Sequence, residues 1–262
     1  MFTAPTAILS ALAEEQRGLI EQLAEPHQVQ HAGRTFWCGS LQGQPVVLAL
    51  SRIGKVAAAT TAAALIERFA VARVVFTGVA GGVADGVCVG DVVVATGFVQ
   101  HDLDVSPLYP KYEVPLYGQS QFAGHPALSD LLHQAAVRAL SEPADESTDT
   151  TGQHLDAEDP WSFPAAQVHL GLLASGDRFV SGAQEVGALF AALQAGGHDV
   201  LAVEMECAAV AQVCFDYGVP FAAVRTISDR ADDTAHLDFN RFVEQVASRY
   251  AQQVVGHFLK LL

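Results

Sequence analysis

Hydrophobic and polar positions along this chain follow two alternating patterns. Short apolar runs of the kind found in strands buried on both faces cover residues 6–11, 73–77, 91–100, 168–174, 200–203 and 221–227. Segments with helical spacing of apolar residues lie between or after them, at about residues 14–24, 55–69, 127–140, 182–194, 207–217 and 239–261. This alternation predicts an α/β fold in which helices cover a largely parallel sheet.

Residues 28–51 do not follow this order of strands and helices. Polar and apolar residues alternate there between turn signals, which predicts an antiparallel meander whose most buried strand is 46–50. The meander makes the sheet mixed, so we predict a three-layer α/β/α sandwich around a central mixed β-sheet. A chain of 262 residues, half of them hydrophobic, can form this fold as a single domain, 1–262. Residues 141–160 contain no Lys, Arg, Phe, Tyr or Trp, and we expect a flexible acidic surface excursion there.

Three acidic residues are predicted to meet at one edge of this sheet. Glu206 begins the helix that follows the strand 200–203, and Asp229 follows the strand 221–227. Glu15 lies in the first turn of the helix after the strand 6–11. In a strand–helix–strand unit these positions all face the carboxyl edge of the sheet, where open α/β sheets bind ligands. Helix capping and solvation are the alternative explanations for each acid taken alone.

A glycine-rich segment is expected at the same edge. Residues 78–82 read G-V-A-G-G directly after a buried strand, and we interpret them as a turn that lets a ligand approach the backbone. The segment is not G-x-G-x-x-G and no Lys follows, so neither a dinucleotide nor a nucleoside triphosphate is indicated. The sequence therefore predicts no cofactor.

The net charge of −15 argues against nucleic acid and anionic membranes as partners, because both attract Lys and Arg. The first residues lack the basic segment of a signal peptide, and no apolar run is long enough to span a bilayer. The four cysteines include no C-x-x-C pair, which favours reduced thiols and a cytoplasmic location. The ten histidines show no H-E-x-x-H or comparable spacing, so no metal site is expected.

Several short motifs, in a fixed order, resemble the 5′-methylthioadenosine/S-adenosylhomocysteine nucleosidases of the nucleoside phosphorylase/hydrolase superfamily. They are S-A-L-A-E-E, S-R-I-G-K-V-A-A-A, T-G-V-A-G-G-V, V-G-D-V-V-V-A, H-D-L-D-V, S-G-D-R-F-V, V-E-M-E and I-S-D-R-A-D. The resemblance covers nearly the whole chain apart from the acidic excursion. It implies a nucleoside phosphorylase-like fold, a small-molecule nucleoside substrate, and hydrolysis of an N-glycosidic bond that releases adenine and a 5-thio-substituted ribose.

The resemblance also implies roles for individual residues. Asp229 would donate a proton to purine N7, and Glu15 would activate water. The residues expected to bind substrate are Glu206 and Met205 at the ribose, Val79 and Ser228 nearby, Phe179 and Val180 at the base, and Leu12, Ile53 and Phe239 in an apolar 5′ pocket. The Pro- and Tyr-rich segment 101–117 suits a lid or a subunit contact. A homodimer is expected in which this segment closes the neighbour's 5′ pocket.

Two departures from the family pattern bear on this reading. Val79 stands where Ser is usual, which leaves one polar contact near the ribose in doubt. Arg52 stands where Gly is usual, and its side chain could alter the 5′ pocket or contact an anion. A purine nucleoside phosphorylase remains an alternative, with Arg17 and Arg52 as candidate phosphate ligands. A hydrolase of deoxyfutalosine-type nucleosides and a catalytically silent nucleoside-binding relative are further alternatives.

Overall fold

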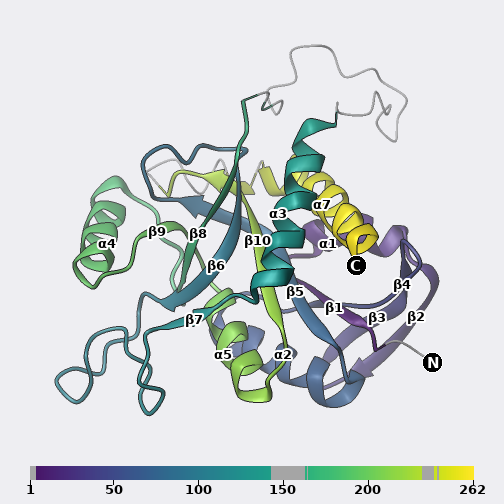
Figure 1. Ribbon diagram of the computed structural model, residues 1–262, viewed down its shortest axis with the longest axis horizontal. Helices are drawn as coiled ribbons and strands as arrows, with labels where there is room; N and C mark the ends of the chain where they lie inside the picture. The colour runs from purple at the N-terminus through teal and green to yellow at the C-terminus, as the bar shows by residue number, and fades with distance from the viewer. Residues whose placement is uncertain (1–3, 143–162, 164, 232–238, 241) are drawn as a thin grey trace.

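The computed structural model describes residues 4–142, 163, 165–231, 239–240 and 242–262 (Figure 1). Residues 143–160 of the predicted acidic excursion lie outside the described residues. Among the described residues, none of the helices has the length and apolar composition needed to cross a membrane.

A ten-stranded mixed sheet forms the centre of the molecule. Its strands are β1 (Thr6–Ser10), β2 (Ala24–His31), β3 (Arg34–Leu41), β4 (Gln44–Leu50), β5 (Arg73–Gly82), β6 (Val92–Gln100), β7 (Gln121–Ala123), β8 (Val168–Ser175), β9 (Val200–Glu204) and β10 (Phe221–Asp229). The order is β10-β6-β8-β9-β5-β1-β4-β3-β2, and β7 pairs with β6. The predicted meander is confirmed, because β2, β3 and β4 pair antiparallel in sequence order.

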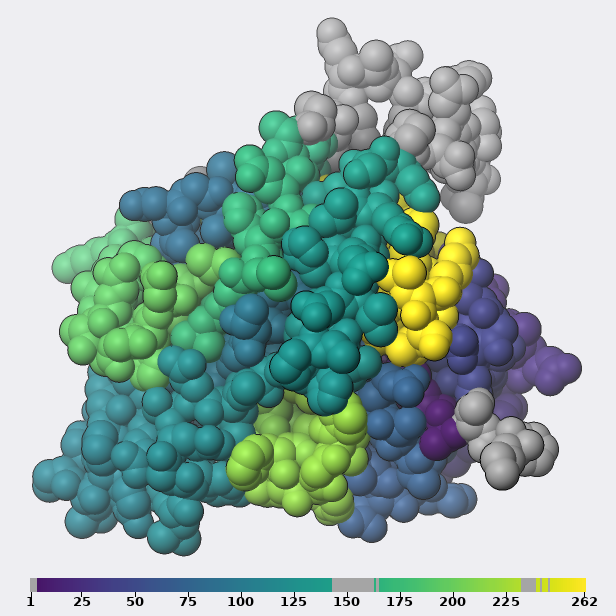
Figure 2. Space-filling view, viewed as in Figure 1, coloured from purple at the N-terminus to yellow at the C-terminus, as the bar shows by residue number. Residues whose placement is uncertain are grey.

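Helices cover both faces of the sheet, which confirms the predicted α/β/α sandwich (Figure 1). One layer holds α1 (Ala13–Glu21), α3 (Pro126–Ser141) and α7 (Ser248–Leu261), and the other holds α2 (Lys55–Phe69) and α5 (Cys207–Tyr217). The helix α4 (Ala183–Ala195) packs near β9. Figure 2 shows α3 in teal beside α7 in yellow on one face of the molecule. Two separate apolar clusters fill the spaces between these layers and the sheet.

The strand β5 holds the sheet together because it pairs with three other strands. It runs parallel to β1 and β10, and its last residues pair antiparallel with β9. Since β10 also pairs with β6, the sheet closes on itself through β5, β10, β6, β8 and β9. The carboxyl ends of β1, β5, β9 and β10 therefore come together in a small space.

The prediction of a turn at residues 78–82 is wrong, since these residues continue β5 to Gly82. The glycines serve close packing of side chains instead of chain reversal. A Cβ atom on Gly78 would overlap the guanidinium of Arg225 and lie 2.9 Å from Oε1 of Glu15. A Cβ on Gly81 would lie 2.9 Å from Oδ1 of Asp229. Glycine thus makes room for charged groups on the neighbouring elements.

Two predicted helices differ from the structure at their ends. The first stops at Glu21, because the chain already enters the edge strand β2 at Ala24. The last is not a uniform α-helix, since a π-helical segment, Val243–Ala247, precedes α7. Its apolar residues still face the core as predicted; Phe242, Val246, Tyr250, Val254 and Phe258 are buried.

Candidate active site

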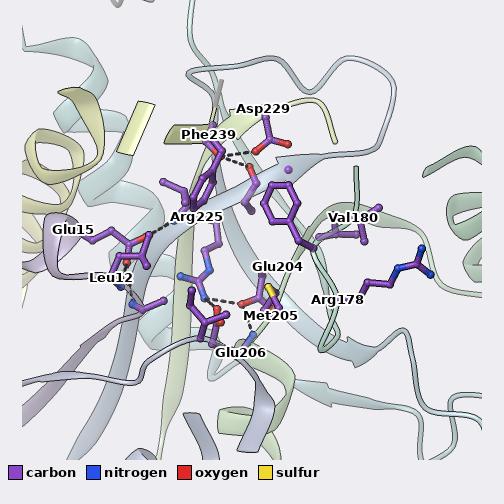
Figure 3. Close-up of a pocket in the computed structure, with 18 residues that line it drawn as sticks. Leu12, Glu15, Arg178, Val180, Glu204, Met205, Glu206, Arg225, Asp229 and Phe239 are labelled. Atoms are coloured by element: carbon purple, nitrogen blue, oxygen red, sulfur yellow. Dashed lines mark hydrogen bonds and ion pairs between the residues drawn. The ribbon is translucent and has the colours of Figure 1, made fainter. Parts of the chain in front are cut away.

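A cavity of about 260 Å³ opens at the carboxyl ends of β1, β5, β9 and β10. All the residues that the sequence analysis assigned to the site line it: Leu12, Glu15, Ile53, Val79, Phe179, Val180, Met205, Glu206, Ser228, Asp229 and Phe239. Seven further residues line the cavity: Ala11, Ala80, Gly81, Arg178, Val203, Glu204 and Arg225. Ala80 and Gly81 belong to the segment 78–82 that was expected at this edge, whereas the other five were not assigned to the site from the sequence. Figure 3 shows Glu15 on the side of Leu12, Asp229 beside Phe239, and Glu206 below Arg225.

The centre of the site is Arg225, whose side chain is 1% exposed. Its Nη2 lies 2.6 Å from Oε2 of Glu204 and 3.4 Å from Oε2 of Glu206. Its guanidinium carbon lies 4.2 Å from the centre of the Phe76 ring, a cation–π contact. A permanent charge at this depth needs buried partners, and Glu204 is the nearer of the two carboxylates.

Glu204 is the charged partner of Arg225. Burial works to raise the pKa of Glu204, but Arg225, the Ser175 hydroxyl and the Cys207 amide outweigh it and hold the pKa below its ordinary value. The two carboxylate oxygens accept from the backbone N–H groups of Glu206 and Cys207 at 2.9–3.1 Å. Glu204 thus fixes the start of α5 and neutralises most of the charge of Arg225.

Glu206 is left without a full counter-charge. Burial, with Glu204 as a second cause, raises the pKa of Glu206 to about 7. One oxygen accepts from the Gly54 N–H at 2.9 Å. A carboxyl group that gains its proton near neutrality is able both to donate and to accept hydrogen bonds, which suits a pair of vicinal hydroxyl groups.

Glu15 occupies the opposite side of Arg225, and it is 1% exposed. Oε2 accepts from the N–H groups of Ala11 and Leu12 at 2.9 and 3.0 Å, and Oε1 accepts from Val79 N–H at 3.1 Å. Burial raises the pKa of Glu15, although Arg225 and these amides lower it in part. A base with a raised pKa accepts protons more readily at neutral pH. Val79 contributes through its backbone N–H, which does not depend on the side chain that replaces Ser.

Asp229 ends β10 and is 3% exposed. Oδ1 accepts from the Ala231 N–H at 2.8 Å, and Oδ2 lies 2.8 Å from the Ser228 hydroxyl. That hydroxyl also lies 3.4 Å from the carbonyl of Ala80. Because a hydroxyl both donates and accepts hydrogen bonds, Ser228 can donate to a charged Asp229, or donate to the Ala80 carbonyl and accept a hydrogen bond from a protonated Asp229. This arrangement suits a carboxyl that gives up and regains a proton.

The mouth of the cavity is apolar. The rings of Phe179 and Phe239 meet edge to face with 5.5 Å between their centres, and Phe179 is 41% exposed. Ile53 is 56% exposed beside them. Exposed aromatic faces next to a buried polar floor are suited to a planar base, with carboxylates below for the sugar.

The two arginines considered as phosphate ligands do not line this cavity. Arg17 is exposed on α1. Arg52 has a left-handed backbone, with φ of 64°, and its Nη2 donates to the carbonyl of Gly33 at 2.5 Å. The cavity's own arginines are both paired, Arg225 with Glu204 and Arg178 with Glu185 at 3.0 Å. Among the described residues, no cluster of His, Cys, Asp and Glu is suited to hold a metal ion.

Comparisons with known proteins place this fold and site in a defined class. The sequence profile described as the phosphorylase superfamily matches residues 5–260. The chain is 36% identical over 248 residues to a 5′-methylthioadenosine/S-adenosylhomocysteine nucleosidase of Anoxybacillus flavithermus, with 95% of each chain covered. The chain therefore belongs to the 5′-methylthioadenosine/S-adenosylhomocysteine nucleosidase family of the phosphorylase superfamily, as the sequence motifs indicated.

Solved structures agree with this assignment. The nucleosidase of Neisseria meningitidis in complex with methylthio-immucillin-A has a TM-score of 0.83 at 33% identity, covering 99% of this chain and 100% of that one. The futalosine hydrolase of Helicobacter pylori has a TM-score of 0.80 at 28% identity, covering 98% of both chains. The fold alone therefore does not separate these two substrate classes.

Proposed function

We propose that this chain hydrolyses the N-glycosidic bond of 5′-methylthioadenosine and S-adenosylhomocysteine, releasing adenine and the 5-thio-substituted ribose. The observation that carries the proposal is the convergence of Glu15, Glu206 and Asp229 on one cavity with an apolar mouth. Breaking this bond builds positive charge on the sugar and negative charge on the departing base. With three separate carboxyl groups, one part of the cavity can stabilise the positive charge on the sugar while another part protonates the departing base.

Each carboxyl group has a task that matches its surroundings. Asp229 protonates N7 of the leaving purine, and Ser228 supports either protonation state. Glu15, held by three backbone amides, takes a proton from the attacking water. Glu206 and the Met205 backbone bind the ribose hydroxyls. Phe179 stacks on the base, the Val180 backbone reads its edge, and Leu12, Ile53 and Phe239 surround the 5′ substituent.

The charges around the cavity favour water over phosphate as the nucleophile. A phosphorylase needs cationic groups that converge on a phosphate dianion. Here both lining arginines are paired with glutamates, and Arg52 points to Gly33 instead of the cavity. Glu15 would repel a dianion at the sugar, at a cost of several kcal/mol where solvent screening is poor.

The test is adenine release from methylthioadenosine with and without phosphate. We expect free adenine and free methylthioribose at a rate that added phosphate leaves unchanged. A futalosine-type nucleoside should be assayed in the same way, because the futalosine hydrolase of Helicobacter pylori shares the fold. The higher identity to the methylthioadenosine/adenosylhomocysteine enzymes favours the thio-substituted substrate. Phosphate-dependent turnover that yields a ribose 1-phosphate would contradict the hydrolase assignment, and no release at all would indicate a silent relative.

A C2 homodimer is part of the same proposal. Leu108 and Leu116, on the Pro- and Tyr-rich segment, are 79% and 91% exposed, and Val56 at the start of α2 is 78% exposed. Exposed apolar side chains that gather into one patch mark interaction surfaces. Tyr117 contacts Phe215 of α5, and α5 packs on α2, so the Pro- and Tyr-rich segment is connected through α5 to the helix that carries Val56.

Light scattering should therefore give twice the mass of the 27.7 kDa chain. Leu116→Asp places a charge in the proposed contact, and we expect it to shift the protein toward monomer and to weaken binding of 5′-substituted nucleosides. A stable, fully active wild-type monomer would rule out the dimer.

A cytoplasmic location also belongs to the proposal. Cys38, Cys88, Cys207 and Cys214 are all free thiols in the structure, which suits a reducing compartment.

A further inference from the structure

Three loops meet beside the cavity, and two of them form its mouth. Loop 51–54 joins β4 to α2 and carries Ile53, and loop 176–182 joins β8 to α4 and carries Phe179. The third, loop 101–104, follows β6 and contributes no residue to the cavity lining within the part of the chain that the structure describes. Its position between the other two is therefore not explained by substrate contact.

Asp102, on that third loop, bonds to both of the others. Oδ1 lies 2.5 Å from Nζ of Lys55, which begins α2 directly after loop 51–54. Oδ2 accepts from the backbone N–H of Asp177 at 2.8 Å. The Lys55 side chain is 16% exposed and that of Asp102 is 30% exposed, so solvent reaches the pair only in part. One carboxylate thus bridges the loops of Ile53 and Phe179.

Asp177 adds a second link between the same two loops. Its Oδ1 accepts from the Lys55 N–H at 2.7 Å, where an acid is favoured by the exposed amides of a helix N-terminus. Gly54 allows this approach: its φ is +97°, and a Cβ there would lie 3.0 Å from Oδ1 of Asp177. The N–H of Gly54 also donates to Glu206 at 2.9 Å. The position of loop 51–54 therefore sets the position of a ribose-binding carboxyl group as well as that of Ile53.

The backbone that carries Asp102 is itself fixed to β8. The N–H of His101 donates to the Ser175 carbonyl at 2.9 Å, and the His101 ring fills the space where a Cβ of Gly176 would stand. Nζ of Lys55 also lies 3.0 Å from Oε1 of Gln100, at the end of β6. Asp102 thus has a rigid base from which it reaches the two loops of the cavity mouth.

The charge of Asp102 is maintained in this position. Burial works to raise the pKa of Asp102, but the hydrogen bonds from Lys55 and the Asp177 amide outweigh it and lower the pKa. The carboxylate is therefore ionised at neutral pH, as both of its hydrogen bonds require.

We propose that Asp102 is a positioning residue that holds the Ile53 and Phe179 loops together and so sets the preference for an apolar 5′ substituent. The inference rests on the proposed function, in which Ile53 faces that substituent. A partly exposed ion pair contributes little to global stability. The ion pair acts instead on the geometry of the two loops. Without it, loop 51–54 would not hold Ile53 at a fixed distance from the substrate.

The test compares Asp102→Asn with the wild type on methylthioadenosine and adenosine. The ratio of the two kcat/KM values cancels any difference in the folded fraction, so a purely structural role would leave it unchanged. We expect this preference for the methylthio compound to fall roughly tenfold, the scale of a lost apolar contact. Lys55→Met removes the other half of the ion pair and should lower the ratio in the same direction.

Glu142→Gln is the matched control, because Glu142 lies outside the segment 101–117 that the proposed dimer places at the neighbour's 5′ pocket. Glu142 directly follows α3, and its Oε2 lies 3.0 Å from Nε2 of His257 in a contact that is also partly exposed. We expect this variant to keep the wild-type ratio. An unchanged ratio in both Asp102→Asn and Lys55→Met, or an equal fall in Glu142→Gln, overturns the proposal.

A readout without substrate separates this inference from the function itself. Hydrogen exchange at the amides of Lys55 and Asp177 should quicken in Asp102→Asn and stay at the wild-type rate in Glu142→Gln. If the wild type released no adenine while exchange changed as expected, the proposed function would fail and the bridge between the loops would stand. Unchanged exchange in Asp102→Asn would overturn the bridge whatever the activity.

Discussion

Asp229→Asn should lose on the order of a hundredfold or more in turnover, the usual scale of general acid catalysis. This corresponds to about 2.7 kcal/mol of transition-state stabilisation. Asn keeps the shape of Asp, can accept from the Ala231 N–H and can donate to the Ser228 hydroxyl, so the end of β10 should stay folded. It has no proton to give to N7. Binding of a ground-state nucleoside analogue should therefore weaken much less than turnover.

Asp91 offers a matched control for the loss of a buried carboxylate. It is 3% exposed, as Asp229 is, but it lies directly before β6, where it forms hydrogen bonds with the His169 ring and the Cys88 and Gln167 amides. Asp91→Asn should lower stability and leave the turnover of the folded enzyme within a few-fold of wild type. Near-normal turnover in Asp229→Asn would mean that another group delivers the proton.

Glu15→Gln should nearly abolish adenine release, with a loss on the order of a hundred- to ten-thousandfold. The amide oxygen of Gln can replace one carboxylate oxygen as an acceptor, but its NH₂ group cannot accept a proton from water. It would also face the Val79 N–H or the Ala11 and Leu12 amides, which are themselves donors. Some loss of stability is therefore expected beside the loss of activity.

The pH dependence gives this prediction a second readout. Glu15 acts as a base only when it is deprotonated, so the rate should fall as the pH drops through its pKa. Since burial raises that pKa, the fall should begin at a higher pH than for an ordinary glutamate. The residual activity of Glu15→Gln should lack this acid limb.

Glu14→Gln is the control for the neighbouring charge. Glu14 belongs to the same first turn of α1 but does not line the cavity. Its variant should keep both the rate and the acid limb. Wild-type turnover in Glu15→Gln would assign water activation to a different group.

The sequence was most informative where the chemistry and the topology agree. Glu15, Glu206 and Asp229 each lie at the end of a strand or at the start of the next helix, and the handedness of parallel connections brings such positions to one edge. Phe179 and Ile53 were reached only through the resemblance to a family, because loops carry no periodicity that would place them. Their cavity positions match that expectation, while their roles stay predictions.

The Arg225–Glu204 pair shows why other parts of the site were missed. Residues 221–227 were interpreted as an apolar core strand, although they contain one arginine. A lone charge in such a run requires a buried partner, and Glu204 directly follows the predicted strand 200–203. The arginine within the apolar run was itself a signal of a buried ion pair, but the identity of its partner depends on the pairing of β10 with β5. The links of Asp102 to Lys55 and Asp177 depend in the same way on contacts between loops that are distant in the sequence.

The arrangement of strands around β5 has a consequence for the synthesis of this protein. Leu12 and Glu15 follow the first strand, whereas Asp229 ends the last, and Phe239 lies beyond it. The strand β5 cannot hold these groups together until β10 has joined it, so the contacts that complete the cavity are among the longest-range contacts in the chain. Contacts of such large sequence separation slow folding, because the loop-closure entropy is lost before the contacts form. The segment up to Phe239 must therefore have left the ribosome before the cavity is complete.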